Sequence, residues 1–447
     1  MAIEVNAPDE PSAMDDVRDV QQTTCCVVGG GPGGMMLALL LARRGVAVTL
    51  LEAHLDFDRN FRGDTLHPAL LEILDEIGLA ERLHQLRHLK WYGPTIMAAD
   101  GPFTPLDFRR LSTRFPYILV IPQETFLDFL AEEARKYPHF RLVMGANVQR
   151  LVEDDGVVRG VRYRGAERWH EVRALLTVGA DGRFSRLRHL ARFQPIKTSP
   201  PIHILWFRLP RLPQDPSGFD STRMPISSQL FACIRGSADH AEESNVGFVF
   251  AGRAGPILIF DRLDHWQMGY LFFDKDHYQT LRTGGLEAFR RSLVELEPRL
   301  APHMEHLTNW QQLSLLSVEF SHCRRWYKPG LLLIGDAVHV MTPAAGAGIK
   351  YAVEDAVVAA NILAEPLKAG RLRLSHLAQV QRRRERPARL MQAMAGFGQQ
   401  FVGRRWNLVR PPLRIPWLVR WLFRVPLVRD LPSRFAGLGL WRVHVQT

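Results

Sequence analysis

The stretch TCCVVGGGPGGMMLALLLARRGVAVTLLEA, residues 24–53, decides the fold. It begins with a short run of cysteine and valine, passes through a glycine cluster and continues as a long apolar segment. After Gly45 a second apolar run follows, and an acid, Glu52, stands at its end. This order predicts a strand, a glycine-rich turn, a helix and a second strand, which together form the βαβ unit of Rossmann-like domains.

The glycines of this stretch have the spacing of a dinucleotide-binding turn. Gly29, Gly31 and Gly34 form the pattern G-x-G-x-x-G. Such glycines let the chain turn tightly and let a pyrophosphate reach the helix N-terminus, where free N–H groups and the helix dipole attract anions. Glu52 would accept hydrogen bonds from the adenosine ribose, which argues against a 2′-phosphate there. The pattern alone leaves FAD and NAD open, because both use this unit.

Length and composition indicate a folded protein with more than one domain. The chain has 447 residues, of which 46% are hydrophobic and 23% are charged. Residues 1–21 carry six acids, one arginine and no apolar run, so we expect a disordered leader, not a signal peptide. No apolar run near the start could span a bilayer, and we expect a cytoplasmic protein. The four cysteines, with Cys25 and Cys26 adjacent, suit buried thiols, and no metal is predicted.

Three further segments accompany the glycine turn. Arg62-Gly63-Asp64 precedes a helix-like stretch, GADGRFSRLR occupies residues 179–188, and GDAVHVMTPAAGAGIK occupies residues 335–350 after an apolar strand. Together with the turn, these segments resemble the single-component FAD-dependent monooxygenases of the aromatic hydroxylase superfamily, the p-hydroxybenzoate hydroxylase type. The resemblance covers about residues 22–395 in order, and the combination is much more specific than any one segment.

The resemblance implies that the cofactor is FAD and which residues surround it. Arg62 and Gln123 would contact the ribityl and pyrophosphate region, and the backbone of Val148 would contact the adenine. Asp336 would bind the ribityl chain, although it could instead be only a helix N-cap. The residues that the resemblance assigns to FAD are Gly29, Gly31, Gly34, Glu52, Arg62, Gln123, Val148, Asp181, Asp336, Pro343, Gly346, Ala347 and Gly348.

The resemblance also implies the reaction. NAD(P)H as co-substrate would reduce FAD, O2 would form a flavin C4a-hydroperoxide, and one oxygen atom would pass to an aromatic or other hydrophobic small molecule. The catalytic candidates are Pro343, beside the flavin ring, and His67, which could deprotonate a phenol or only start a helix. Two alternatives remain open: an FAD-dependent reductase of isoprenoid-type double bonds, and a flavin-binding module without oxygenase turnover.

Residues 196–318 differ from the rest of the chain. Short segments rich in β-branched and aromatic residues predict a mainly antiparallel sheet, which in the resembled family covers the flavin. In the last segment, residues 265–274, alternation separates two faces. Both faces contain aromatic residues, so the sequence does not decide between them. We take as substrate residues the face with Trp266, Met268, Tyr270 and Phe272; the other holds His265, Gln267, Gly269, Leu271 and Phe273.

The predicted fold class is α/β, with a Rossmann-like FAD-binding domain, a mainly antiparallel substrate domain and a C-terminal helical segment. The predicted FAD-binding domain is discontinuous, and comprises residues 22–88, 117–195 and 319–395. The substrate domain comprises residues 89–116 and 196–318. A basic amphipathic segment follows at residues 396–447.

The C-terminal segment is strongly basic, because residues 404–447 hold nine arginines and a single acid, Asp430. A short helix is predicted between Pro416 and Pro426. Its apolar face could dock on the catalytic body, contact a membrane surface or form a hydrophobic entrance. We favour docking. Nucleic-acid binding is disfavoured, because the arginines interleave with apolar residues and prolines. The apolar face consists of Trp417, Leu418, Trp421, Leu422 and Val425.

Lys350 departs from the resembled pattern, since the family commonly has asparagine after the paired glycines. Two placements are open from the sequence. The side chain could reach solvent or pair with Glu354 four residues later. Alternatively it could face the flavin, add positive charge beside the reduced ring and raise the reduction potential.

Overall fold

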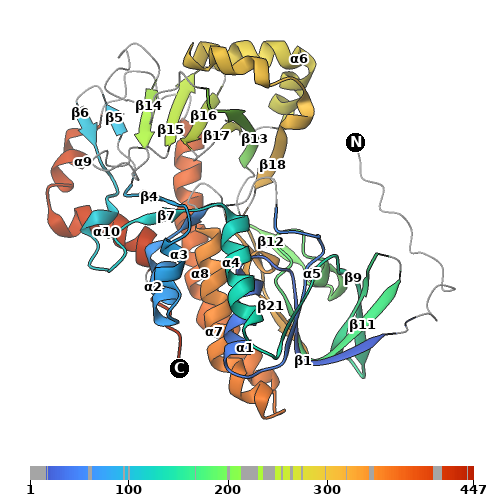
Figure 1. Ribbon diagram of the computed structural model, residues 1–447. Coiled ribbons are helices and arrows are strands. Elements are labelled where there is room, and N and C mark those ends of the chain that lie inside the picture. The colour runs from blue at the N-terminus through green and yellow to red at the C-terminus, as the bar shows by residue number, and fades with distance from the viewer. Residues whose placement is uncertain are drawn as a thin grey trace.

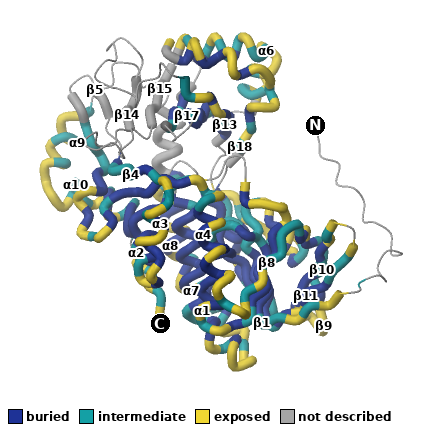
Figure 2. Tube along the Cα trace, in the orientation of Figure 1, coloured by how far each residue is buried: buried dark blue, intermediate teal, exposed yellow. Residues whose placement is uncertain are grey.

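The computed structural model describes residues 17, 19–58, 63–93, 96–98, 101–166, 168–198, 202–212, 230–234, 247–252, 255–261, 265–272, 275–296, 298–318, 320–341, 347–405, 415–439 and 441–446. An α/β layer and a second, antiparallel sheet lie one above the other (Figure 1). Among the described residues, the α/β layer contains a large cluster of buried hydrophobic side chains (Figure 2). The predicted fold class is therefore confirmed.

The main sheet is eight-stranded, and its central strands run parallel in the order β21-β11-β1-β2-β8. β20 pairs antiparallel with β21, while β10 and β9 extend antiparallel from β11. The strands are β1 (Val20–Val28), β2 (Val48–Leu51), β8 (Phe140–Val143), β9 (Asn147–Asp154), β10 (Val157–Arg164), β11 (Trp169–Gly179), β20 (Tyr327–Lys328) and β21 (Leu331–Leu333). β1 begins at Val20, which pairs with Glu171, so the last two residues of the predicted leader belong to the sheet.

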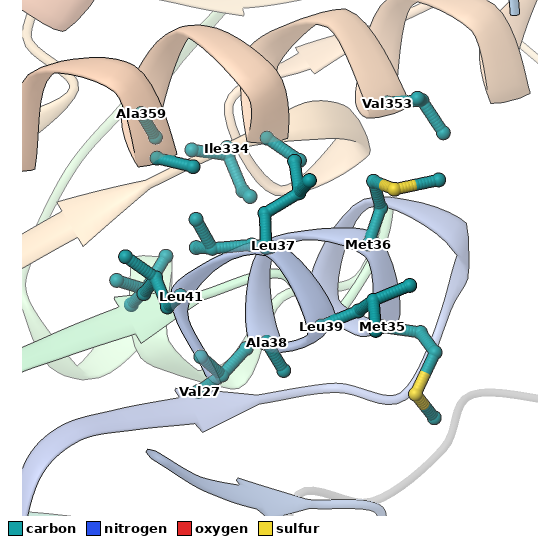
Figure 3. Close-up of a cluster of buried hydrophobic side chains, with 14 of the residues drawn as sticks. Val27, Met35, Met36, Leu37, Ala38, Leu39, Leu41, Ile334, Val353 and Ala359 are labelled. Atoms are coloured by element: carbon teal, nitrogen blue, oxygen red, sulfur yellow. The ribbon is translucent and has the colours of Figure 1, made fainter. Parts of the chain in front are cut away.

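Helix α1 (Pro32–Arg43) lies at the centre of this layer. Its apolar residues point in all directions, as expected for a helix enclosed on all sides. α1 packs against α4 (Gln123–Arg135) and against α7 (Gly348–Lys368), and α7 packs in turn against α8 (Leu374–Arg405). Met36 and Leu37 of α1 face Val353 and Ala359 of α7 (Figure 3). This packing fixes the N-termini of α1 and α7 relative to each other.

The second sheet is six-stranded and antiparallel, in the order β14-β15-β16-β17-β13-β18. Helix α6 (Lys275–Leu296), which is kinked at Gly285, lies across it (Figure 1). Two 3₁₀ segments follow α6, η4 (Pro298–His306) and η5 (Trp310–Gln312). The strands are β13 (Ile202–Pro210), β14 (Leu230–Ile234), β15 (Gly247–Gly252), β16 (Gly255–Asp261), β17 (His265–Phe272) and β18 (Ser314–Val318).

Three small sheets connect these parts. They have the strand orders β3-β7-β4, β12-β19-β22 and β5-β6. Their strands are β3 (Thr65–Leu66), β4 (Leu89–Trp91), β5 (Ile96–Ala98), β6 (Gly101–Phe103), β7 (Ile118–Val120), β12 (Pro195–Lys197), β19 (Ser321–Cys323) and β22 (His339–Val340). The remaining short helices of the body are α2 (Pro68–Glu76), α3 (Ala80–His84), α5 (Arg186–Leu190), η2 (Phe108–Arg110) and η6 (Gly335–Ala337).

The C-terminal segment folds as α9 (Trp417–Leu422) and α10 (Pro426–Leu438). α10 docks on the body, because Leu438 is buried against Phe108 and its neighbours, and the Ser433 hydroxyl accepts a hydrogen bond from the Asp107 amide at 2.8 Å. The apolar face of α9, in contrast, stays exposed (Figure 2). The docking prediction, which concerned the helix between Pro416 and Pro426, is therefore wrong for that face, and it is the following helix, α10, that docks. Across the described part of the chain, no helix combines the length and the apolar character needed to cross a membrane.

Candidate functional site

In the turn between β1 and α1, each glycine of the pattern has its own structural reason. Gly29 has a φ of 105°, and a Cβ there would lie 2.5 Å from the carbonyl oxygen of Ala180. A Cβ on Gly34 would overlap the carbonyl oxygen of Gly29. At Gly31, which precedes α1, a Cβ would meet no atom within 4 Å. Gly29 and Gly34 thus permit close packing, whereas Gly31 leaves open space at a helix N-terminus, where an anion would bind.

Glu52 lies directly after β2, beside this turn. Its side chain is almost fully buried, and its carboxylate accepts hydrogen bonds from the amides of Gly30 at 2.8 Å and His54 at 3.0 Å. These bonds hold the carboxylate next to the glycine turn. The position is the one from which an acid contacts the ribose of a bound dinucleotide.

A cavity of about 1020 Å³ connects this turn with the second sheet. Gln123, at the start of α4, lines it, and Val148 of β9 lines it near the turn. Among the predicted FAD residues, those that line the cavity are Gly29, Gly31, Glu52, Gln123, Val148, Asp181, Asp336 and Gly348. Gly34 lies behind the turn and Ala347 is buried as the N-cap of α7. Arg62, Pro343 and Gly346 lie outside the described residues.

The cavity fits FAD at two places. At the first, the N-terminus of α1 is open at Gly31, where a pyrophosphate would lie. At the second, α7 begins at Gly348, where a Cβ would again meet no atom within 4 Å. The N–H groups at the start of α7 therefore suit an electron-rich edge of the flavin ring. Two helix N-termini on one cavity match a ligand with a pyrophosphate and a second polar group.

Asp181 belongs to a loop that is hydrogen-bonded to the loop of Asp336. Its carboxylate accepts hydrogen bonds from the Ser185 hydroxyl at 2.5 Å and the Leu187 amide at 3.0 Å. Burial raises the pKa of Asp181, and these two donors partly oppose the rise. Arg188 donates to the carbonyl oxygen of Ala337 at 2.8 Å, directly after Asp336. The two acids therefore have a fixed separation on the cavity wall.

A buried polar network supports the Asp336 loop from behind. Asp355 of α7 accepts hydrogen bonds from the Gly335 amide at 2.9 Å, from His339 Nε2 at 2.6 Å and from Arg384 Nε at 2.7 Å. Arg384 also binds Glu354 at 2.7 Å. Burial alone would raise the pKa of Asp355, but His339 and Arg384 bring it below its ordinary value. His339 thus supports the loop and does not line the cavity.

Sequence reasoning did not identify Asp355 and Arg384. The available signal was an adjacent acid pair, Glu354 and Asp355, inside an otherwise apolar helix. An acid on a buried helix face requires a partner, because an unpaired buried charge is strongly destabilising. Arg384 lies 29 residues away on α8, so the sequence alone could not identify it as that partner.

The face of β17 chosen for the substrate was wrong. Its residues lie in a core between the sheet and α6, where Tyr270 and Phe289 rings pack edge to face at 5.6 Å. The opposite face lines the cavity through His265, Gln267 and Leu271. Because helix α6 covers one face of the sheet, only the other can face FAD. The substrate prediction is therefore wrong for four residues, Trp266, Met268, Tyr270 and Phe272.

Gly269 of β17 has a clear role on the cavity side. It pairs with Trp206 of β13. Because Gly269 has no side chain, the indole of Trp206 can lie over it; a Cβ on Gly269 would be 3.1 Å from the nearest indole atom. Trp206 therefore lies over the strand and joins the cavity wall with Phe260. The two rings are 6.0 Å apart between centroids. They form an aromatic wall on the substrate side.

His67 lines the cavity and is also bound to the C-terminal helix. The side chain is buried, and its Nδ1 lies 3.0 Å from the carbonyl oxygen of Ala436 in α10. Since a carbonyl accepts only a donated proton, Nδ1 carries hydrogen and Nε2 is the basic nitrogen of the neutral ring. His67 precedes α2 and does not cap it with its side chain. The sequence did not indicate this link to the tail.

Lys350 follows neither of its two expected placements. The side chain is 1% exposed, it is not part of the cavity lining, and Glu354 pairs with Arg384 instead. Among the described residues, Nζ has no hydrogen-bond partner, and it would lie 3.3 Å from a Cβ on Gly439, at the end of α10. Burial lowers the pKa of Lys350, Glu354 partly opposes this and Arg384 adds to it. Lys350 is thus directed towards the C-terminal segment.

Comparisons with known proteins agree with this site. The sequence pattern of the family described as FAD binding domain matches residues 22–219 and 271–394. The 6-methylpretetramide 4-monooxygenase of Streptomyces rimosus is 33% identical over 400 residues, which are 88% of this chain and 87% of that protein.

Two solved structures share the fold. OxyS anhydrotetracycline hydroxylase from Streptomyces rimosus is 22% identical and superposes with a TM-score of 0.66 over 93% of this chain and 76% of that one. The flavin-dependent brominase Bmp2 is 15% identical, with a TM-score of 0.69 over 94% of each chain. Since the family pattern covers most of the chain and its residues surround a fitting cavity, the chain belongs to the FAD-dependent monooxygenases of the single-component aromatic hydroxylase family.

Proposed function

We propose that this monooxygenase takes electrons from NAD(P)H and inserts one oxygen atom from O2 into a planar aromatic small molecule. The observation that carries the proposal is one continuous cavity of about 1020 Å³, which extends from Gly31 at the glycine turn to Trp206 on the second sheet. Small-molecule sites are typically about 300–1,000 Å³. A cavity at the upper limit suits a cofactor and a substrate held together.

The walls on the substrate side support an aromatic ligand. The rings of Trp206 and Phe260 are tilted by 33° to each other, and both lie on the cavity. Aromatic faces favour planar ligands through offset stacking and through the apolar area that they bury. The 33% identical relative acts, by its name, on 6-methylpretetramide, which agrees with a small-molecule substrate.

The residues of the chain have separate tasks in this proposal. When bound, FAD supplies the redox chemistry, by accepting electrons from NAD(P)H and passing one oxygen atom of O2 to the substrate while the other leaves as water. The N–H groups at the start of α7, at Gly348, stabilise negative charge without reorganisation. The apolar side of the second sheet, including Leu271 and Phe260, keeps water away from the reacting atoms.

His67 is the residue that we assign as proton acceptor for a phenolic substrate. It lines the cavity, and the Ala436 carbonyl holds the tautomer in which Nε2 is basic. Removing the phenolic proton raises the electron density of the ring that is to be oxygenated. General-base assistance of this kind contributes typically about 10²–10⁴-fold in rate.

The test is a turnover screen of the purified, FAD-loaded protein. Aromatic small molecules are added under air, and the oxidation of NADPH and of NADH, the uptake of O2 and the product mass are followed. We expect stimulated oxidation of one of the two donors, and a product heavier by one oxygen atom that carries label from ¹⁸O2.

The Gly31→Val variant is the matched control, because its side chain would occupy the space where the pyrophosphate binds. We expect a folded protein without bound FAD and without stimulated oxidation. A product that gains two hydrogens without O2 uptake would contradict the oxygenase proposal and favour the reductase alternative. Label from H2¹⁸O in the product would also contradict it.

A further inference from the structure

Helix α9 contacts the body on one side and leaves an apolar face exposed on the other. On the inner face, the rings of Phe423 and Phe103 of β6 lie 5.0 Å apart, and the Arg420 guanidinium lies 5.8 Å from the centre of the same Phe103 ring. On the outer face, Trp417 is 77% exposed and Trp421 is 53% exposed. The inner contacts hold the helix on the body, so the outer face is presented in a fixed orientation.

The beginning of α10 extends this apolar surface. We define the tail patch as the exposed side chains of Trp417, Leu418, Trp421, Leu422, Leu427 and Leu431. The other side of α10 is buried against the body through Ser433 and Leu438. Single exposed apolar residues are ordinary on protein surfaces, but two tryptophans and four leucines within 15 consecutive positions, 417–431, indicate an interaction surface.

The charges around the tail patch select its partner. Arg424 is exposed beside the outer face of α9, and Arg434 is exposed on α10. The only acid of residues 404–447, Asp430, pairs with Arg429 at 3.1 Å. The tail therefore keeps a net positive charge next to its apolar face, so the partner must offer apolar contact and negative charge together.

An anionic lipid surface meets both requirements. A second copy of this chain does not, because a symmetric contact would bring the same arginines against each other. Tryptophan and leucine together with neighbouring arginines are the composition of helices that lie in the membrane interface. Tryptophan also prefers the headgroup level of a bilayer. α9 has six residues, roughly 9 Å of helix, so contact is with the surface and does not span the bilayer.

We propose that the tail patch binds the surface of a bilayer containing anionic lipids, with the outer face of α9 inserted at headgroup level. This inference does not depend on the proposed reaction. It assigns a function to the basic C-terminal segment, whose inner side packs behind the cavity wall through Leu438, Ile118 and Val120.

The experiment is vesicle flotation of the full-length, FAD-loaded protein. One vesicle preparation contains phosphatidylcholine alone and the other contains one third phosphatidylglycerol, both at physiological salt. We expect binding to the anionic vesicles only. Trp421→Ser should weaken this binding about tenfold through lost apolar burial. Arg424→Gln should weaken it about fivefold, the effect typical of one basic residue at an anionic surface.

Trp441→Ser is the matched control, because Trp441 is 51% exposed in the same basic tail but lies outside α9. Its binding should equal that of the unmodified protein. FAD content and turnover in solution should be unchanged in Trp421→Ser, which separates loss of binding from loss of the enzyme. The proposal would be overturned if both tryptophan variants floated equally, or if the protein bound neutral vesicles as strongly as anionic ones. It would also be overturned if the protein formed a dimer that depends on Trp421 and did not bind vesicles.

Discussion

His67 Nδ1 lies 3.0 Å from the carbonyl oxygen of Ala436, although 369 residues separate the two in the chain. The contact joins the cavity wall to the C-terminal helix α10, which the Ser433 hydroxyl also fastens to the body. A helix that is outside the Rossmann-like unit therefore sets the tautomer of a cavity residue. Loss of α10 would change the chemistry of the cavity and not only the stability of the fold.

His67→Gln tests this role. We expect FAD to remain bound and kcat to fall about 10²-fold for a phenolic substrate. His303→Gln is the matched control, since His303 is equally buried and its Nδ1 also lies near a carbonyl oxygen, that of Pro210 at 3.1 Å, away from the cavity. Equal kcat values for the phenolic substrate in all three proteins would refute the assignment.

Gly31→Ala and Gly34→Ala separate the two roles of the glycine turn. At Gly31, φ is −70° and no atom lies near the added methyl group, so the apoprotein should be as stable as before or more stable by about 0.4–1 kcal/mol. Its FAD affinity should fall by about tenfold or more, 1.4 kcal/mol. Gly34→Ala should instead lower the free energy of unfolding by about 3 kcal/mol, because the methyl group overlaps the Gly29 carbonyl. Denaturant unfolding measures the stability of the two variants, and FAD titration measures their affinity. Equal changes of stability and of FAD affinity in both variants would contradict the separate roles of Gly31 and Gly34.

Asp355→Asn should destabilise the fold by about 3–5 kcal/mol at pH 7, because it leaves Arg384 and Glu354 in a buried, incomplete network. The pKa of Asp355 in the folded protein is below the ordinary 3.8. The unfolded chain therefore binds the proton first, and this part of the stability is present above 3.8 and lost as the pH falls below it. The difference in the free energy of unfolding between the variant and the unmodified protein should become smaller below pH 3.8. Glu365→Gln, on the exposed side of the same helix, should leave unfolding unchanged at every pH.

Lys350→Met should stabilise the protein by about 1–3 kcal/mol at pH 7, since it removes a buried amino group to which the described part of the chain offers no hydrogen-bond partner. The pKa of Lys350 in the folded state is below the ordinary 10.5, so the unfolded chain binds this proton first as the pH falls from 10.5. The unmodified protein should lose stability over that range, and the variant should not. The flavin reduction potential should stay the same in Lys350→Met and Lys350→Asn. A shift in both variants would mean that Lys350 acts on the flavin after all.

Trp206→Ala and Trp266→Ala test which face of the second sheet meets the substrate. Trp206 lies on the cavity, and its loss should raise KM roughly tenfold with little effect on stability. Trp266 is buried on the opposite face beside His303, with ring centroids 4.4 Å apart. Its loss should lower the free energy of unfolding by about 3–5 kcal/mol. Steady-state kinetics and thermal unfolding of both variants check the assignment. A raised KM in Trp266→Ala together with a loss of stability in Trp206→Ala would exclude it.

Several parts of the site could be predicted from the sequence because their patterns are local. The spacing of Gly29, Gly31 and Gly34 follows from what a tight turn before a helix requires, and the structure places them in such a turn. The strand-like segments of residues 196–318 could be located because alternation and turn residues act within a few positions. The segment predicted at residues 265–274, for example, contains β17, which spans His265–Phe272.

The sequence by itself thus determined the α/β class, the dinucleotide-binding turn and the existence of an antiparallel second sheet. Only the tertiary structure decided which face of β17 meets the cavity, because both faces contain aromatic residues and the position of α6 makes the choice. It also decided that Lys350 is buried beside α10 and that His67 is bound to Ala436. These outcomes depend on contacts between separate elements, such as β17 with α6 and His67 with Ala436 of α10, and burial and hydrogen bonding between elements are set by packing and not by local pattern.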